Sequence, residues 1–215
     1  MARSVADEKK YLRAVLSECR DAIPAEIAKA LSGAIQQRLI ASDAYRSAGQ
    51  LVLYAPRNNE VSTDLIFADA VASGRSVFFP RYERERKSIV AAYVDSLSDL
   101  KPGSFGVNEP CADARVASSH ELADAIICVP GLGFGPEGQR LGRGGGHYDR
   151  FLWGLAPESI TAGLAYSFQL LDRIPESPSD RRLKLIVTEY ALLQASDWSE
   201  ASGAARTRGG RPGWN

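Results

Sequence analysis

Glycines and arginines are concentrated in the segment GQRLGRGGGHYDRF, residues 138–151, in a pattern that could bind phosphate. Eight of the chain's 19 glycines lie between Gly131 and Gly146, and backbone N–H groups in such a loop can turn towards an anion. A helix that follows the loop adds the positive end of its dipole. Arg140 and Arg143 contribute fixed charge, and their forked N–H donors suit phosphate oxygens. The segment therefore predicts a site for a phosphorylated ligand.

Asp149 is the residue of this segment that an anion site alone does not explain. Magnesium usually binds through one or two carboxylates together with substrate phosphates, so the aspartate indicates a site for a magnesium–nucleotide complex. The alternative is a long flexible loop in which Arg143 and Asp149 form a surface ion pair. Two standard nucleotide fingerprints are absent. The chain has no GK[ST] sequence, and its single GxGxxG, residues 133–138, contains Pro136 and is not expected to open a helix.

The composition is that of a globular protein with one domain. The chain has 215 residues, of which 45% are hydrophobic and 24% are charged, enough for one sizeable core. Lysine plus arginine and aspartate plus glutamate both number 26, so the formal net charge is zero. Such a chain has no general attraction for nucleic acid or an anionic membrane. We therefore expect neither of these partners, and we expect a monomer.

Cysteine usage and the lack of long apolar segments predict a cytoplasmic protein. Cys19, Cys111 and Cys128 are scattered, odd in number and never spaced as CxxC, which argues against a disulfide framework or a zinc site. No apolar run approaches the roughly 20 residues of a membrane span. The first ten residues are not followed by the hydrophobic region of a signal peptide. We expect the protein to remain in the reducing compartment where it is made.

Hydrophobic periodicity predicts alternating helices and short strands. A charged, amphipathic helix is expected over residues 6–20, and Pro24 opens a second helix. Four residues spaced by four form the predicted core face of that second helix: Ile27, Leu31, Ile35 and Leu39. A third helix is expected over residues 62–73, ended by Gly74, and a short fourth over residues 147–153. The predicted strands cover residues 50–54, 76–80, 88–94, 125–130, 160–166 and 183–190.

This alternation predicts an α/β fold with one domain over residues 1–200, in which helices flank a largely parallel central sheet. The glycine-rich loop joins the end of the strand at 125–130 to the start of the last predicted helix. Ligands of open α/β sheets usually bind beyond the carboxyl ends of the strands, where this connection would lie. Residues 201–215 carry three arginines and no acid, and we expect a disordered basic tail there. Nucleic-acid binding by the three arginines is the alternative.

A longer segment, VPGLGFGPEGQRLGRGGGHYDRFL at residues 129–152, resembles the signature of the 5-formyltetrahydrofolate cyclo-ligases. That signature runs from a VPG strand end through an aromatic-containing loop to RLGxGxGYYDR. Shorter matches follow in the family's order: KKYLR, NNEVST, FFPRY, GSFGVNEP and SDRRLKLIVTEY. Together the matches extend over residues 9–190. The resemblance implies a single α/β domain like that of sugar-phosphate isomerases and CoA-transferases.

The resemblance also implies a reaction. It is the ATP- and Mg²⁺-dependent closure of 5-formyltetrahydrofolate to 5,10-methenyltetrahydrofolate, with release of ADP and phosphate. The formyl oxygen cannot leave as oxide, so the γ-phosphate of ATP is transferred to it first. The neighbouring folate amine then attacks the activated carbon, and phosphate departs. Catalysis of this kind rests on positioning and electrostatic stabilisation more than on a protein nucleophile.

Individual roles follow from the resemblance, position by position. The catalytic positions are Lys9 and Arg143, and the metal positions are Asp149 and Asp180. The ATP-binding positions are Lys9, Arg13, Arg140, Leu141, Gly142, Arg143, Gly144, Gly145, Gly146, His147 and Tyr148. The substrate-binding positions are Arg13, Tyr54, Glu60, Phe105, Arg143, Gly146, His147 and Tyr148. Among these, Glu60 matches a carboxylate that accepts hydrogen bonds from the pterin ring, and Phe105 matches an aromatic wall of the pterin pocket.

Three positions depart from the family pattern. His147 stands in place of the first tyrosine of YYD, Ser179 in place of a histidine, and Lys184 in place of a common acidic residue. Imidazole is smaller than phenol and titrates near neutrality, so we expect a change in folate packing or in pH dependence. The changes at Ser179 and Lys184 weaken the assignment of Asp180 to the metal.

Two other functions are compatible with parts of the pattern. One is a binding module that retains ATP or folate without turnover, although such a protein has no physical reason to keep Lys9, Glu60, Arg143 and Asp149 together. The other is a sugar-phosphate isomerase or a CoA-transferase on a similar fold. It would need a base or a glutamate nucleophile in a pocket, and no segment singles one out.

Overall fold

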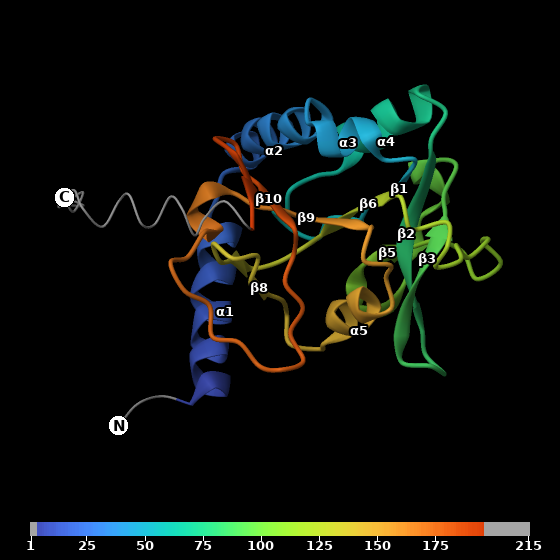
Figure 1. Cartoon of the computed structure of the whole chain (residues 1–215). Coiled ribbons are helices and arrows are strands. Elements are labelled where there is room, and N and C mark those ends of the chain that lie inside the picture. The colour runs from blue at the N-terminus through green and yellow to red at the C-terminus, as the bar shows by residue number, and fades with distance from the viewer. Residues whose placement is uncertain (1–3, 196–215) are drawn as a thin grey trace.

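The computed structural model describes residues 4–195, and its centre is a seven-stranded sheet (Figure 1). The strands lie in the order β11-β10-β9-β6-β1-β2-β3. Their bounds are β1 Gln50–Val52, β2 Ser76–Glu83, β3 Ser88–Tyr93, β6 Ala125–Val129, β9 Ile160–Leu164, β10 Leu185–Val187 and β11 Leu192–Gln194. The five inner strands run parallel, and each edge strand is antiparallel to its neighbour. The sheet is therefore largely parallel, as expected.

Helices cover both faces of this sheet. Their bounds are α1 Val5–Asp21, α2 Ala25–Ile40, α3 Asp43–Ser47, α4 Asp64–Ala72 and α5 His147–Trp153. In Figure 1, α2, α3 and α4 lie together above the sheet, α5 lies below it, and α1 stands beside it. None of the helices within residues 4–195 is long and apolar enough to cross a membrane.

Alternation along the strands builds a separate core on each face. In β6, Ile126 packs in the cluster under α2–α4, whereas Ile127 packs in the cluster that contains Leu152 of α5. Adjacent side chains of a strand point to opposite faces, and because helices cover both faces every residue of β6 is buried. The continuous apolar runs in the sequence are the direct result of this double burial.

The predicted elements are confirmed, although several strand ends differ and the short helix α3 was not predicted. The core face of α2 is narrower than the sequence suggested, since Ile27 is 51% exposed while Ile35 and Leu39 are fully buried. The predicted strand at 183–190 is shorter, because β10 ends at Val187 and a tight turn leads into the antiparallel strand β11. The predicted tail at 201–215 lies outside the described residues.

Two short hairpins project from the sheet and were not predicted. Strands β4 (Lys101–Pro102) and β5 (Asn108–Glu109) form one, and β7 (Gly133–Phe134) and β8 (Arg140–Leu141) form the other. The second hairpin lies within the glycine-rich connection between β6 and α5.

Phe134 anchors this second hairpin to the sheet. Its ring is fully buried against Gly131 and Gly163, where a Cβ atom would come within 2.6 Å and 2.5 Å of the ring respectively. Glycine is therefore needed at both positions to make room for the aromatic side chain. Because β8 continues into the glycine-rich loop, the position of that loop depends on this packing.

Substitution of Gly163 by alanine should lower the free energy of unfolding by about 1–3 kcal/mol, since the new methyl group overlaps the Phe134 ring. The matched control is Gly33→Ala in α2, where no atom lies within 4 Å of the added Cβ. That change should raise stability by about 0.5–1 kcal/mol, because alanine favours the helix. Urea unfolding followed by circular dichroism measures both; equal effects of the two changes would contradict the packing described.

Candidate functional site

A cavity of about 1030 Å³ opens where the parallel strands end at their carboxyl termini. It is lined by α1, the segments that follow β1 and β6, part of β2, the loop at 104–109, the glycine-rich loop with α5, and the segment 177–180. Every residue that the sequence assigned to binding or catalysis contributes to this lining. Segments as distant as residues 9 and 180 therefore meet in one place.

The glycine-rich loop follows the β7–β8 hairpin and leads into α5. Gly144 and Gly146 have φ angles of +101° and +64°, which residues with a side chain rarely adopt. Gly146 is the N-cap of α5, so the loop ends at the positive end of that helix. Leu141 belongs to the loop only through its backbone, because its side chain packs in a small core with Leu16 of α1.

Arg140 and Asp149 form an ion pair at the base of the loop. Arg140 Nη2 lies 3.0 Å from Asp149 Oδ1, and the Arg140 side chain is only 3% exposed. Arg140 Nε is buried without a hydrogen-bond partner among the described residues. The alternative of a surface pair between Arg143 and Asp149 is wrong, since Asp149 pairs with Arg140 and Arg143 pairs with Glu60.

Two basic residues of α1 reach the cavity from one face of the helix. Lys9 Nζ forms an ion pair with Asp180 and a 3.0 Å hydrogen bond with Ser177 Oγ. One turn further on, Arg13 Nε donates a 2.8 Å hydrogen bond to the carbonyl oxygen of Gly142. The spacing of four residues thus places both cations beside the glycine-rich loop.

Glu60 lines the cavity and lies between two arginines. Arg143 Nη2 is 3.0 Å from Glu60 Oε1, and Arg20 Nη1 is 3.4 Å from the same oxygen. The other carboxylate oxygen accepts a 3.0 Å hydrogen bond from the backbone N–H of Arg57. Sequence reasoning missed Arg20, although it lies seven residues, or two helical turns, after Arg13 on the same face of α1.

Aromatic side chains form a flat-walled part of the cavity. The rings of Tyr82, Phe105 and His147 lie in mutual contact, with centroids 4.9–5.0 Å apart. Tyr82 was not among the predicted site residues, although it is the last residue of FFPRY, one of the segments that carried the resemblance. His147 Nδ1 accepts a 2.8 Å hydrogen bond from Arg150, and burial together with the Arg150 charge lowers the pKa of His147. The imidazole is therefore a neutral aromatic surface at pH 7.

Two predicted tyrosines form walls of the cavity: Tyr54 is buried and Tyr148 is partly buried. The Tyr54 hydroxyl donates a 2.8 Å hydrogen bond to the carbonyl oxygen of Val61. Burial, and secondarily the negative charge of Glu60, raises the pKa of both Tyr54 and Tyr148. Neither phenol can serve as a source of protons near neutral pH, so they shape the cavity.

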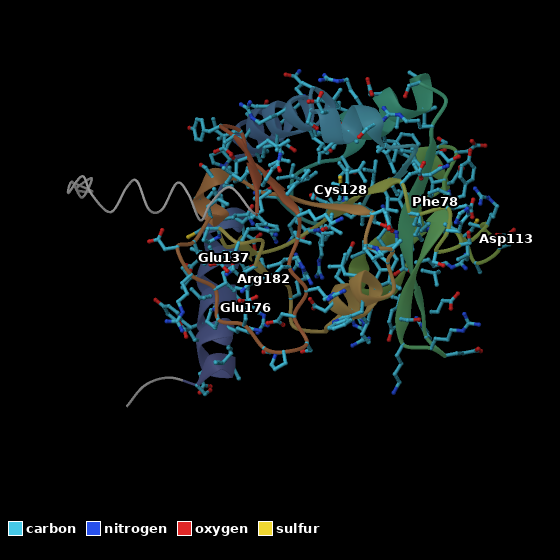
Figure 2. The ribbon with its side chains drawn as sticks, in the orientation of Figure 1. Phe78, Asp113, Cys128, Glu137, Glu176 and Arg182 are labelled. Carbon is cyan, nitrogen blue, oxygen red and sulfur yellow. The ribbon has the colours of Figure 1, made fainter. Side chains whose placement is uncertain are left out.

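Cys128 lies in β6, labelled in Figure 2, and its side chain is buried in the core cluster under α2–α4. Burial raises the pKa of its thiol to about 12. A thiol in this state is not a nucleophile at neutral pH.

Ion pairs outside the cavity hold the segment that carries Asp180. Figure 2 shows Arg182 between Glu137, in the turn of the β7–β8 hairpin, and Glu176. Both arginine-to-carboxylate distances are 2.6 Å, and the two carboxylates raise the pKa of Arg182. The segment at 177–180 is thereby tied to the hairpin that bears the glycine-rich loop.

The predicted metal ligands both line the cavity, and their chemistry suits magnesium. Asp149 uses Oδ1 for Arg140 and the N–H of Arg181, while Asp180 uses Oδ2 for Lys9 and the N–H of Ser177. The second oxygen of each carboxylate has no hydrogen bond within residues 4–195. Those residues contain no cluster of three or more histidine, cysteine or acidic side chains that could hold a metal alone. Magnesium that takes its remaining ligands from phosphate and water fits such a pair.

Comparison with known proteins gives one consistent answer. A family model described as the 5-formyltetrahydrofolate cyclo-ligase family matches residues 5–189. The 5-formyltetrahydrofolate cyclo-ligase of Mus musculus is 28% identical over 196 residues, which cover 87% of this chain and 97% of the mouse protein. The NMR structure of 5,10-methenyltetrahydrofolate synthetase from Aquifex aeolicus has a TM-score of 0.76 at 27% identity and covers 96% of both chains. The corresponding synthetase of Mycoplasma pneumoniae shares the fold, with a TM-score of 0.69 at 24% identity over 85% of this chain and 99% of that one.

Substitution of Gly144 by alanine should weaken the binding of a nucleoside triphosphate by at least about tenfold, because a φ of +101° strains any side chain and the loop must move. The control is Gly154→Ala at the C-cap of α5, where φ is −86° and the added Cβ makes an ordinary contact. Isothermal titration calorimetry with ATP should give the control the affinity of the unchanged protein. Unchanged affinity in Gly144→Ala would contradict the role of the loop.

Proposed function

The chain belongs to the 5-formyltetrahydrofolate cyclo-ligase family and is an enzyme of the ligase class. We propose that it converts 5-formyltetrahydrofolate and ATP, with Mg²⁺, into 5,10-methenyltetrahydrofolate, ADP and phosphate. The observation that carries this proposal is the arrangement of the cavity. Its two kinds of wall, a basic glycine-rich loop and an aromatic surface beside a carboxylate, are directly adjacent. A phosphate chain and a flat heterocycle can therefore meet within one enclosed site.

The basic half of the cavity suits the triphosphate. Arg13 and Arg143 are only partly buried and can turn their N–H donors towards phosphate oxygens. Lys9 supplies a further point charge from α1. Arg140 is buried in its ion pair with Asp149, so its part is to hold the aspartate and the base of the loop. Backbone N–H groups of the glycine-rich loop complete the cradle.

The aromatic half of the cavity suits the pterin. Tyr82, Phe105 and His147 offer ring faces and edges for stacking. Glu60 offers a carboxylate that accepts hydrogen bonds from the amino and ring N–H groups of the heterocycle. Its own partner Arg143 belongs to the glycine-rich loop, so the two halves of the cavity are in direct contact through one ion pair.

The reaction proceeds in two steps, in which these residues bind and stabilise the reactants and form no covalent bond with them. The formyl oxygen of the folate attacks the γ-phosphorus of ATP, the bond from that phosphorus to the ADP oxygen breaks, and ADP leaves. The N10 amine then attacks the formyl carbon and loses its proton, and the carbon–oxygen bond breaks to release phosphate and the methenyl product. Arg13, Arg143 and Lys9 stabilise negative charge on the transferring group.

Magnesium would be held by Asp149 and Asp180 together with phosphate oxygens, and when bound it neutralises part of the phosphate charge. Asp180 is paired with Lys9 in the ligand-free arrangement. Asp180 Oδ1 has no hydrogen bond within the described residues, so it can bind a metal while Lys9 keeps Oδ2 or turns to a phosphate oxygen. In the latter case Asp180 would contact the metal, and Lys9 the phosphates, of the same metal–nucleotide complex.

We also propose that the protein acts as a monomer in the cytoplasm. The cavity is built from a single chain, and all three cysteines lie in the described residues and are free. Exposed free thiols such as Cys19 and Cys111 suit a reducing compartment.

Purified protein mixed with 5-formyltetrahydrofolate, ATP and Mg²⁺ should produce the near-ultraviolet absorbance of the methenyl product. The increase should vanish when ATP is omitted or when a chelator removes the metal. Binding of ATP or folate by calorimetry without any increase would replace the ligase with a binding protein of the same fold.

Replacement of Asp149 by asparagine should reduce Mg²⁺-dependent turnover by at least about tenfold, because one metal-binding carboxylate is lost. The control is Asp113→Asn, since Asp113 is exposed and lies at the far edge of the molecule from Arg182 in Figure 2. Turnover is measured against Mg²⁺ concentration, with circular dichroism as the check on folding. Unchanged turnover and Mg²⁺ dependence in Asp149→Asn would refute the assignment.

A further inference from the structure

We propose that Arg20 is a positioning residue, which holds the Glu60 carboxylate in the orientation that accepts hydrogen bonds from the folate throughout the catalytic cycle. The inference rests on the proposed function, in which Glu60 binds the pterin. Arg20 does not itself line the cavity. It acts through Glu60, whose carboxylate does line the cavity.

Arg20 is held rigidly in the interior. Only 1% of its surface is exposed, although arginine is among the residues least often buried. The last turn of α1, to which it belongs, is fastened to the segment before Glu60 by the Asn59 side chain. Asn59 Nδ2 donates to the carbonyl oxygens of Arg20 and Ile23, at 3.1 Å and 2.9 Å. The guanidinium and Glu60 therefore have a fixed relation to each other.

The hydrogen bonds of Arg20 do not explain its burial. Nε and Nη2 are buried without a partner among residues 4–195, and Nη1 makes a single 3.4 Å contact with Glu60 Oε1. Desolvation of so many donors is costly and is compensated here only by the charge of Glu60. The arrangement favours a residue that serves as a counter-ion.

Glu60 needs a second counter-ion because the first one is mobile. The Arg143 side chain is 44% exposed and belongs to the glycine-rich loop, whereas the Glu60 side chain is only 10% exposed. When Arg143 turns to the phosphates, Glu60 loses that partner while it remains desolvated by the bound pterin. A buried carboxylate that loses its cation is left with an uncompensated charge and tends to turn towards solvent. Arg20 prevents this because it cannot leave.

The other charged or titratable groups around Glu60 do not replace Arg20. The charged or titratable groups are Arg143 of the glycine-rich loop, Tyr54 after β1, Tyr148 of α5 and Tyr166 after β9. The backbone N–H of Arg57 contributes a neutral hydrogen bond. Burial raises the pKa of all three tyrosines, so they stay neutral. Arg20 is thus the one permanently buried cation that contacts Glu60 within the described residues.

The test compares Arg20→Met and Arg20→Lys with the unchanged enzyme in steady-state assays with 5-formyltetrahydrofolate and ATP. In Arg20→Met, KM for the folate should rise by at least about tenfold at neutral pH while KM for ATP changes by less than about threefold. The pH profiles of both variants are recorded from about 8.5 to about 6, with the profile of the unchanged enzyme as the reference. Arg20→Lys retains the charge and should restore most of the folate affinity and the original pH profile.

The matched control is Arg38→Met in α2. Arg38 is also partly buried and donates to the carbonyl oxygens of Thr188 and Glu189, but it does not approach the cavity. This variant should lose stability without any pH-dependent change in folate KM. If Arg20→Met does not fold, Arg20→Lys carries the test, and equal increases in its KM for folate and ATP would overturn the proposal.

Equal KM values and pH profiles in Arg20→Met and the unchanged enzyme would likewise overturn the proposal. Failure of the proposed function gives a different result, namely no turnover by the unchanged enzyme. In that case calorimetric titration of 5-formyltetrahydrofolate replaces KM, and a folate affinity that is the same in all three proteins at every pH refutes the role of Arg20.

Discussion

Charge compensation between distant segments is the constraint on which the cavity depends. Three of the acids that line it face a base from another segment: Asp180 faces Lys9, Asp149 faces Arg140, and Glu60 faces Arg143 and Arg20. The fourth among the described residues, Glu109, accepts a hydrogen bond from the backbone N–H of Ser104. Burial makes an unpaired charge costly, so each pair fixes the relative position of two segments. Together they connect α1, the segment after β1, the glycine-rich loop, α5 and the segment at 177–180. The sheet provides the platform, and the ion pairs determine how the loops above it meet.

The same pairs differ in how readily they can be exchanged. Arg140 and Arg20 are almost fully buried, which makes them permanent partners of Asp149 and Glu60. Arg143 is nearly half exposed and can leave its carboxylate when a more highly charged ligand arrives. Within residues 4–195 the lining carries six lysine or arginine side chains and four aspartate or glutamate side chains, so the site keeps a local excess of positive charge although the whole chain has none. This explains how a chain with zero net charge can hold a triphosphate without a field that attracts anions in general.

Much of the fold could be predicted from the sequence because the inner strands are buried on both faces. Such strands are short, continuous apolar runs, as at Ala125–Val129, and the helices between them have clear ends. The short hairpins were missed because two-residue strands leave no periodic signal. In the site, the glycine cluster and Asp149 could be picked out from the sequence by their spacing. Arg20 could not, because an arginine on a charged helix is expected to be solvated unless the partner beside which it is buried is known. The choice of Arg140 over Arg143 as the partner of Asp149 also required the path of the loop in space.

In the proposed reaction the formyl oxygen is phosphorylated before the ring closes. The most direct measurement uses 5-formyltetrahydrofolate with ¹⁸O in the formyl group and follows the label by mass spectrometry of the released phosphate. If the formyl oxygen is phosphorylated first, each turnover should deliver one labelled oxygen to inorganic phosphate, while ADP remains unlabelled. Product formation with unlabelled phosphate, the label having passed to water, would contradict this mechanism.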